Sequence, residues 1–159
     1  MAKVNTNAMR ILDTQKIPYE ILTYDSKDGK IDGVAVAGKI GREPAQVYKT
    51  LVVVGTSKDL YVFVIPVEAE LNMKKAAREA GEKSLEMLPV KDIQKFTGYI
   101  RGGCSPVGMK KNYPTFLDES AQELETIIVS AGKIGFQVEL APDQLISAVD
   151  GKYAELVKA

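Results

Sequence analysis

The 159 residues include 21 basic side chains, 21 acidic side chains, one cysteine and no histidine. This length is typical of one domain with one hydrophobic core, so we expect a single domain over residues 1–159. The zero net charge gives no global attraction for a polyanion, and the shortage of thiols and imidazoles argues against a disulfide and against a zinc, copper or iron site. The lack of histidine also excludes the usual Ser–His and Cys–His nucleophile pairs.

The sequence has no sign of export or membrane insertion. Its first residues contain no apolar run of signal-peptide length, and no window approaches about 18 consecutive apolar residues. We therefore expect a soluble, cytoplasmic protein without a membrane segment. No internal repeat, low-complexity segment or linker divides the chain.

Periodicity in the first third of the chain predicts a helix, a strand and a second short helix. Residues 7–16 carry apolar side chains at helical spacing after Thr6, which is a suitable N-cap. Residues 19–25 alternate as a strand does. A polar loop follows, and 33–44 is helix-like until glycine and proline stop it.

The middle of the chain predicts the centre of a sheet. The runs 47–55 and 60–67 are rich in β-branched and aromatic residues and are separated by TSKD, which indicates a mostly buried hairpin. Strong helix formers at 72–81 end at Gly81, a typical C-terminal cap. Another short helix is expected at 90–96.

The last third predicts strands at 114–118, 125–132 and 135–140, followed by a helix at 141–149 with proline at its first position. Residues 152–159 are expected to add a final helical turn or two. Strands and helices are mixed without strict βαβ alternation. We therefore expect an α+β fold in which a mixed, mainly antiparallel sheet forms a barrel-like core with surrounding helices.

The segment TGYIRGGCSPVGMKK, residues 97–111, contains four glycines, one proline and the single cysteine. Gly102 and Gly103 lack a Cβ, which lets a substrate group approach their N–H groups as in an oxyanion hole. A tight turn between a helix and a strand uses the same residue types, so the local pattern leaves both interpretations open. The spacing matches neither GxGxxG before a helix nor GK[ST], and no cofactor is expected.

Three side chains need a choice between a structural and a chemical role. Lys49 begins a buried strand, either as an edge residue whose ammonium reaches solvent or as a pocket residue that holds a carbonyl or phosphate oxygen. Cys104 has no histidine to deprotonate it and is interpreted as a small buried apolar residue. Ser105 lacks the same base and is interpreted as a hydrogen-bond donor.

Basic residues in two parts of the chain are compatible with a rim that binds a nucleic-acid backbone. The alternative is an ordinary solvated surface, which the zero net charge favours. The residues concerned are Lys74, Lys75, Arg78, Lys110, Lys111 and Lys133.

Four segments together resemble one known family: QVYKTLVVV, TGYIRGGCSPVGMKK, PTFLDESAQE and IIVSAGKIGFQVELAPDQL. They resemble the YbaK/EbsC family of bacterial Cys-tRNA(Pro) deacylases, which is related to the editing domain inserted in prolyl-tRNA synthetases. The ordered motifs K-T-L, G-G-x-S-P-x-G and S-x-G-K carry the resemblance over nearly the whole chain. It implies removal of cysteine from mischarged Cys-tRNA(Pro), with prolyl-tRNA synthetase as a partner.

The resemblance also implies a mechanism and site residues. In this family the thiol of the substrate attacks its own ester carbonyl and releases a thiolactone, which removes the need for histidine. Lys49 matches the family's site lysine, which would hold and polarise the aminoacyl-adenosine end. Gly102 matches the glycine whose amide faces the carbonyl. The remaining matched substrate-binding positions are Tyr24, Thr50, Gly103, Ser105, Pro106 and Ser130.

Two other functions stay open at this point. A binding module of the same fold would hold an aminoacyl-tRNA end or a small ligand without turnover, and Gln137 in place of a family aspartate favours it. A deacylase for Ala-tRNA(Pro) or another small mischarged amino acid would have to position a water, because its substrate has no thiol. Neutral net charge predicts weak, salt-sensitive tRNA binding by this chain alone.

Overall fold

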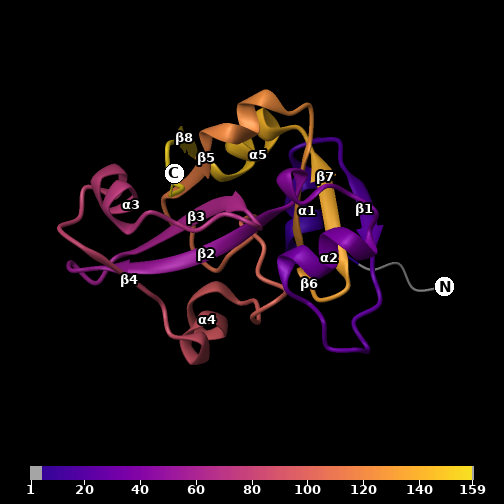
Figure 1. The fold of residues 1–159 in the computed structure, drawn as a ribbon, viewed down its shortest axis with the longest axis horizontal. Helices are drawn as coiled ribbons and strands as arrows, with labels where there is room; N and C mark the ends of the chain where they lie inside the picture. The colour runs from indigo at the N-terminus through magenta and orange to yellow at the C-terminus, as the bar shows by residue number, and fades with distance from the viewer. Residues whose placement is uncertain (1–4, 159) are drawn as a thin grey trace.

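The structure is a computed structural model that describes residues 5–158 (Figure 1). Its α-helices and 3₁₀ helices are α1 Asn7–Thr14, α2 Gly33–Lys39, η1 Pro44–Gln46, α3 Met73–Ala80, α4 Val90–Thr97, η2 Glu119–Glu123 and α5 Pro142–Val149. Its strands are β1 Glu20–Thr23, β2 Tyr48–Gly55, β3 Leu60–Pro66, β4 Leu85–Met87, β5 Thr115–Asp118, β6 Ile127–Lys133, β7 Phe136–Leu140 and β8 Lys152–Ala154.

The strands form two sheets rather than one. The smaller has the order β1-β7-β6 and is antiparallel, whereas the larger, β4-β2-β3-β5-β8, pairs β3 with β5 and β5 with β8 in parallel. A parallel bridge between Val47 and Ile128 joins the two sheets just before β2 begins. The α+β class and the mainly antiparallel pairing are confirmed. Neither sheet closes on itself within residues 5–158, so a barrel-like core is not confirmed.

The helices begin and end where capping residues allow. The Thr6 side chain accepts a hydrogen bond from the Met9 N–H at 3.1 Å and starts α1 as predicted. Asn72 caps α3 by accepting from two backbone N–H groups. Gly81, with φ of 73°, ends that helix in the left-handed conformation that glycine adopts without strain.

The hairpin of β2 and β3 lies at the centre of the larger sheet, as the sequence predicts. Val62 and Val64 pack in a core cluster that includes residues of the smaller sheet. Phe63 and Ile65 pack on the other face, where the Phe63 ring stacks on Phe116 with centroids 5.2 Å apart. Because β3 is buried on both faces, its sequence is a continuous apolar run.

The C-terminal segment corrects one prediction. Residues 152–154 form β8 beside β5, not a helical turn, and Val157 bridges to Leu71 in an antiparallel pair. The buried carboxylate of Asp118 accepts the Leu156 N–H at 3.1 Å and holds the segment in this place. Pairing with a distant strand therefore overrides the local helical tendency. The short strand β4 and the helix η2 were not predicted, and residue 159 lies outside the described residues.

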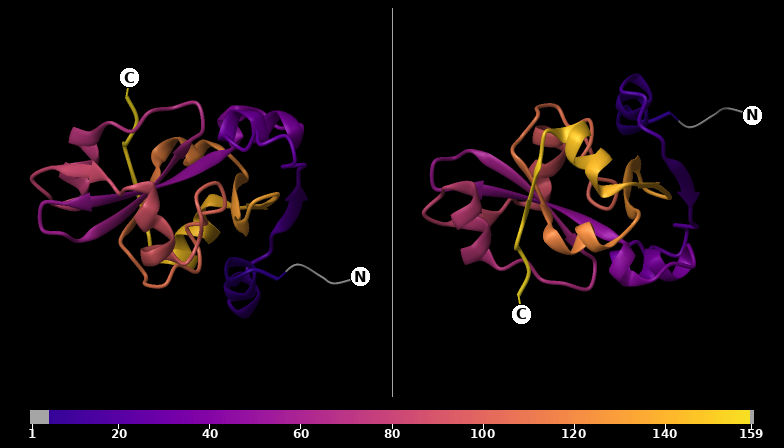
Figure 2. Two further views of the ribbon diagram at one scale, coloured as in Figure 1. Left: turned by 90° about the horizontal axis from the view of Figure 1, so that it is seen from below. Right: turned by 90° about the horizontal axis from the view of Figure 1, so that it is seen from above.

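Two helices cover opposite faces of the smaller sheet (Figure 2). Met9 of α1 packs in the same core cluster as Val129 and Val138, whereas Ala37 of α2 packs with Ile128. Strand alternation separates these two sets of sheet residues. The α2 side of this sheet faces the start of β2, where the predicted site begins. No helix in residues 5–158 is long and apolar enough to cross a membrane.

Candidate active site

A cavity of about 250 Å³ lies between α2, the start of β2, the loop before β5 and the strands β6 and β7. We call it the site cavity. Four of the residues predicted from the sequence line it: Lys49, Thr50, Gly102 and Ser130. They belong to the larger sheet, the glycine-rich loop and the smaller sheet. The junction of the two sheets therefore brings together residues that are far apart in the chain.

Strand β2 contributes Lys49 and Thr50 beside the bridge that joins the sheets. Lys49 is half-buried and forms no ion pair with a residue in the 5–158 range. The Thr50 hydroxyl is buried and has no hydrogen-bond partner among the described residues. A buried hydroxyl without a partner costs free energy, so this atom is suited to a bond with a ligand.

The glycine-rich loop contributes Gly102, whose φ is 87°. A Cβ at this position would lie 2.7 Å from Ile31 Cδ1, so a side chain would enter the space beside the cavity. The Gly103 N–H donates to the Ile100 carbonyl at 3.0 Å and closes the turn. The Gly102 N–H donates to no other described residue, which leaves it available to an oxygen that develops negative charge.

Strand β6 contributes Ser130 at an irregularity in its pairing with β7. The Ser130 Oγ accepts the Gly132 N–H at 3.2 Å, and a hydroxyl that accepts in this way can still donate its own hydrogen. Gln137, which replaces the family aspartate, stands opposite Ser130 in the register and also lines the cavity. The wall at this position is therefore polar but uncharged.

The other predicted positions do not line the site cavity. The Tyr24 hydroxyl is buried without a hydrogen-bond partner among the described residues, and Lys39 Nζ lies 5.9 Å from the centre of its ring. Ser105 is fully buried, and its Oγ accepts the Val107 N–H at 3.2 Å. Pro106 lines a different cavity, and Gly103 is buried in the turn. Their roles in substrate binding stay predictions.

Sequence reasoning missed several residues that line the cavity, among them Arg101 and Gly33. Arg101 is exposed and lines it directly before the glycine pair, so a cation next to two glycines was the available signal. Gly33 begins α2, and a Cβ there would lie 2.3 Å from Val67 Cγ1. This glycine lets α2 approach the segment after β3 closely and form one wall. Only the folded structure shows that contact.

Cys104 lines the site cavity, but its chemistry argues against a nucleophile. Burial raises the pKa of its thiol to about 11, so the thiol stays protonated at neutral pH. We predict that Cys104→Ala retains most of the deacylase activity, measured as ester loss from charged tRNA. Complete loss of activity in a variant with the wild-type melting temperature would identify Cys104 as the nucleophile.

Among the described residues, those that line the site cavity include cations and hydrogen-bond donors but no carboxylate. Lys49 and Arg101 are the cations, and the Gly102 N–H and the hydroxyls add uncharged donors. In residues 5–158 no three His, Cys, Asp or Glu side chains are grouped as metal ligands. Such a site can bind and polarise a carbonyl or phosphate oxygen, but it provides no side chain that would take a proton from a nucleophile at neutral pH.

The model of the aminoacyl-tRNA editing domain matches residues 32–148, about three quarters of the chain. The chain belongs to the aminoacyl-tRNA editing domain family. The match includes every residue that lines the site cavity except Ile31. In this editing-domain protein the cavity is therefore built from the part of the chain that defines the family.

Individual relatives agree with this assignment. A protein of Enterococcus faecalis, provisionally named Cys-tRNA(Pro)/Cys-tRNA(Cys) deacylase EbsC, is 47% identical over 95% of this chain and 92% of its own. The proline–tRNA ligase of Shouchella clausii is 31% identical over 63% of this chain and 17% of its own. The resemblance to the YbaK/EbsC family is thus confirmed.

A solved structure shows that the fold is shared as well. A crystal structure described as that of a provisional trans-editing enzyme for prolyl tRNA synthetase superposes with a TM-score of 0.85. It is 23% identical and covers 99% of this editing-domain chain and 100% of its own.

Proposed function

We propose that this chain is a trans-editing deacylase that removes cysteine from mischarged Cys-tRNA(Pro) in the cytoplasm, as one editing domain over residues 1–159. One observation carries the proposal beyond the family. The site cavity has cations and free hydrogen-bond donors but neither a carboxylate nor a histidine. A site of this kind is suited to a substrate that carries its own nucleophile. The cysteinyl ester is such a substrate.

In the proposed reaction the thiol sulfur of the bound cysteine forms a bond to its own ester carbonyl carbon. The bond from that carbon to the ribose oxygen then breaks. The thiol proton ends on the ribose hydroxyl of the released tRNA, and the cysteine leaves as a cyclic thiolactone that water later hydrolyses. The protein holds the ester in a conformation that favours attack and stabilises the negative charge on the carbonyl oxygen.

Five of the lining residues have a part in this scheme. The Lys49 ammonium holds and polarises the aminoacyl-adenosine end, and the Gly102 N–H donates to the carbonyl oxygen as it gains charge. The unpaired Thr50 hydroxyl and the Ser130 hydroxyl bind polar groups of the same end. Arg101 at the rim attracts the phosphate of the terminal nucleotide.

The proposal is tested by the rate of ester loss from Cys-tRNA(Pro), Ala-tRNA(Pro), Ser-tRNA(Pro) and the 2-aminobutyryl ester. The last has nearly the shape of the cysteinyl ester but lacks the sulfur. We expect loss above background from the cysteinyl ester alone, with a thiolactone trapped before hydrolysis. Equal rates for the cysteinyl and aminobutyryl esters would exclude attack by the substrate thiol.

The second candidate is a binding module of the same fold, and the uncharged Gln137 opposite Ser130 favours it. Saturable binding of charged tRNA with no ester loss from any of the four substrates would support this candidate. Loss from the alanyl ester would instead support a deacylase that positions a water.

The zero net charge predicts weak binding of tRNA by this chain alone, so the proposal includes a partner. We propose that prolyl-tRNA synthetase supplies the selection of tRNA(Pro). If so, adding the synthetase lowers the KM for Cys-tRNA(Pro) relative to other cysteinyl-tRNAs. Tight and selective binding of tRNA(Pro) by the free protein at physiological salt would contradict this part.

A further inference from the structure

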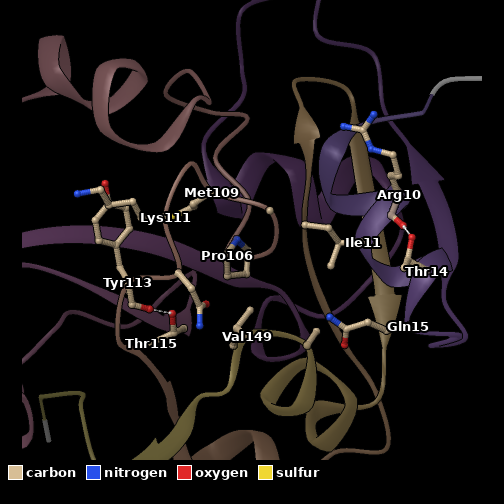
Figure 3. A pocket seen from close by; sticks show the side chains of 13 residues that line it. Arg10, Ile11, Thr14, Gln15, Pro106, Met109, Lys111, Tyr113, Thr115 and Val149 are labelled. Carbon is tan, nitrogen blue, oxygen red and sulfur yellow. Dashed lines mark hydrogen bonds between the residues drawn. The ribbon is translucent and has the colours of Figure 1, made fainter.

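A second and larger cavity, of about 450 Å³, lies between α1, α5 and the far end of the glycine-rich loop (Figure 3). We call it the α1 cavity. It opens on the α1 side of the smaller sheet, whereas the site cavity lies on the α2 side. The loop borders both: Gly102 lines the site cavity and Pro106 lines the α1 cavity. The proposed reaction uses none of the residues of the α1 cavity.

The α1 cavity has positively charged side chains in its lining although the protein has zero net charge. Arg10 and Lys111 lie at opposite ends, with Ile11, Pro106 and Val149 between them (Figure 3). Neither cation forms an ion pair with a described residue, and no acidic side chain is found among the lining residues. The cavity thus has an apolar middle between two unpaired positive charges.

Polar and aromatic groups complete the lining. The Gln15 side chain reaches in between Ile11 and Val149 (Figure 3), and its amide makes no hydrogen bond to another described residue. Tyr113 lies at the Lys111 end, where its hydroxyl donates to the Phe96 carbonyl at 2.7 Å and fixes the ring. A fixed aromatic ring is a surface on which a base stacks, and an amide can bond to the edge of a base.

We infer that the α1 cavity binds an unpaired nucleotide of the tRNA strand, outside the reacting end. The base enters the apolar middle, with Gln15 on one side of it and Tyr113 on the other, and the two phosphates that flank it lie at Arg10 and Lys111. A single strand has this alternation of charge, apolar ring and charge, and a lone phosphate does not. The inference rests on the proposed function, because it takes tRNA to be the substrate.

The glycine-rich loop brings one edge of each cavity close to the other. Gly102 and Pro106 are four residues apart, so their Cα atoms are separated by at most about 14 Å. A short unpaired strand can span such a distance from the site cavity to the α1 cavity. The glycine-rich loop then contacts the substrate at both of its ends.

The test compares Arg10→Ala/Lys111→Ala with Lys74→Ala/Arg78→Ala, a matched pair of exposed cations on α3 at the far end of the molecule (Figure 1). The measured quantity is kcat/KM for full-length Cys-tRNA(Pro) divided by kcat/KM for cysteinyl-adenosine. We expect this ratio to fall about tenfold for the first variant and to stay at the wild-type value for the control. Loss of two phosphate contacts should also make the plot of log kcat/KM for Cys-tRNA(Pro) against log salt concentration less steep, by about 1.4 in slope.

Several results would overturn the inference. They are an unchanged ratio, an equal fall for the control, and a fall that appears only when prolyl-tRNA synthetase is present, which would indicate a protein contact. Gln15→Ala repeats the test at an exposed residue if the double variant unfolds.

Failure of the proposed function gives a different result. If wild-type protein cleaves neither ester, that function fails, and the inference is judged by direct binding of a short single-stranded RNA. Binding that Arg10→Ala/Lys111→Ala weakens and Lys74→Ala/Arg78→Ala does not would support the α1 cavity. No saturable binding would refute it.

Discussion

Lys49→Ala should lower the single-turnover rate of ester loss from Cys-tRNA(Pro) by at least about 100-fold, the loss typical for a donor that stabilises a developing oxyanion. Lys49 lines the site cavity and forms no ion pair with a described residue, so its charge is available to the substrate. The measurement is single-turnover ester loss at saturating protein, which separates the chemical step from binding.

The matched variants separate charge from packing. Lys49→Met keeps the apolar stem without the ammonium and should lose nearly as much rate as Lys49→Ala. Lys74→Ala removes an exposed lysine of α3 and should keep the wild-type rate. A Lys49→Met protein with near-normal turnover would remove Lys49 from the mechanism and leave Arg101 as the cation of the site.

Gly102→Ala should lower the same rate by about 100-fold and also reduce stability. Its φ of 87° costs a residue with a Cβ about 1–2 kcal/mol, and the new Cβ would lie 2.7 Å from Ile31 Cδ1. Ile31 can move, but both it and the loop then shift at the wall of the cavity. The Gly102 N–H would leave the position from which it donates to the carbonyl oxygen.

Gly81→Ala is the control because it shares the conformation without the contact. Gly81 has φ of 73°, ends α3, and a Cβ there would meet nothing within 4 Å. Thermal unfolding should show destabilisation of both variants, whereas only Gly102→Ala should lose the deacylase rate. Equal rates for both variants would show that the Gly102 amide takes no part in the reaction.

Most of the fold follows from local signals. Caps at Thr6 and Gly81 and the two apolar runs around TSKD predict elements that the structure confirms. The division into two sheets has no local signal, because it depends on which distant strands pair, and the bridge between Val47 and Ile128 that joins the sheets also links residues far apart in the chain. The segment that forms β8 was wrongly predicted as a helical turn, because its pairing partner, β5, lies more than 30 residues away.

The sequence predicted several of the residues that line the site cavity, but it did not predict the shape of the cavity. Lys49, Thr50, Gly102 and Ser130 were named through the resemblance, and all four line one cavity. The close packing of α2 against Val67, which forms one wall of the cavity, has no signal in the sequence. For the same reason the sequence does not show that Pro106 lines the α1 cavity rather than the site cavity.

The pairing of β8 also affects the order in which the protein folds during synthesis. In the larger sheet Val62 pairs with Thr115, Phe116 pairs with Lys152, and Leu71 pairs with Val157. Contacts between residues so distant in sequence form slowly. A nascent chain therefore cannot complete this sheet until residues 152–157 have left the ribosome. Because β2 belongs to the same sheet, a partly synthesised chain has an incomplete support for Lys49, and we expect editing competence to arise only after residues 152–157 have left the ribosome.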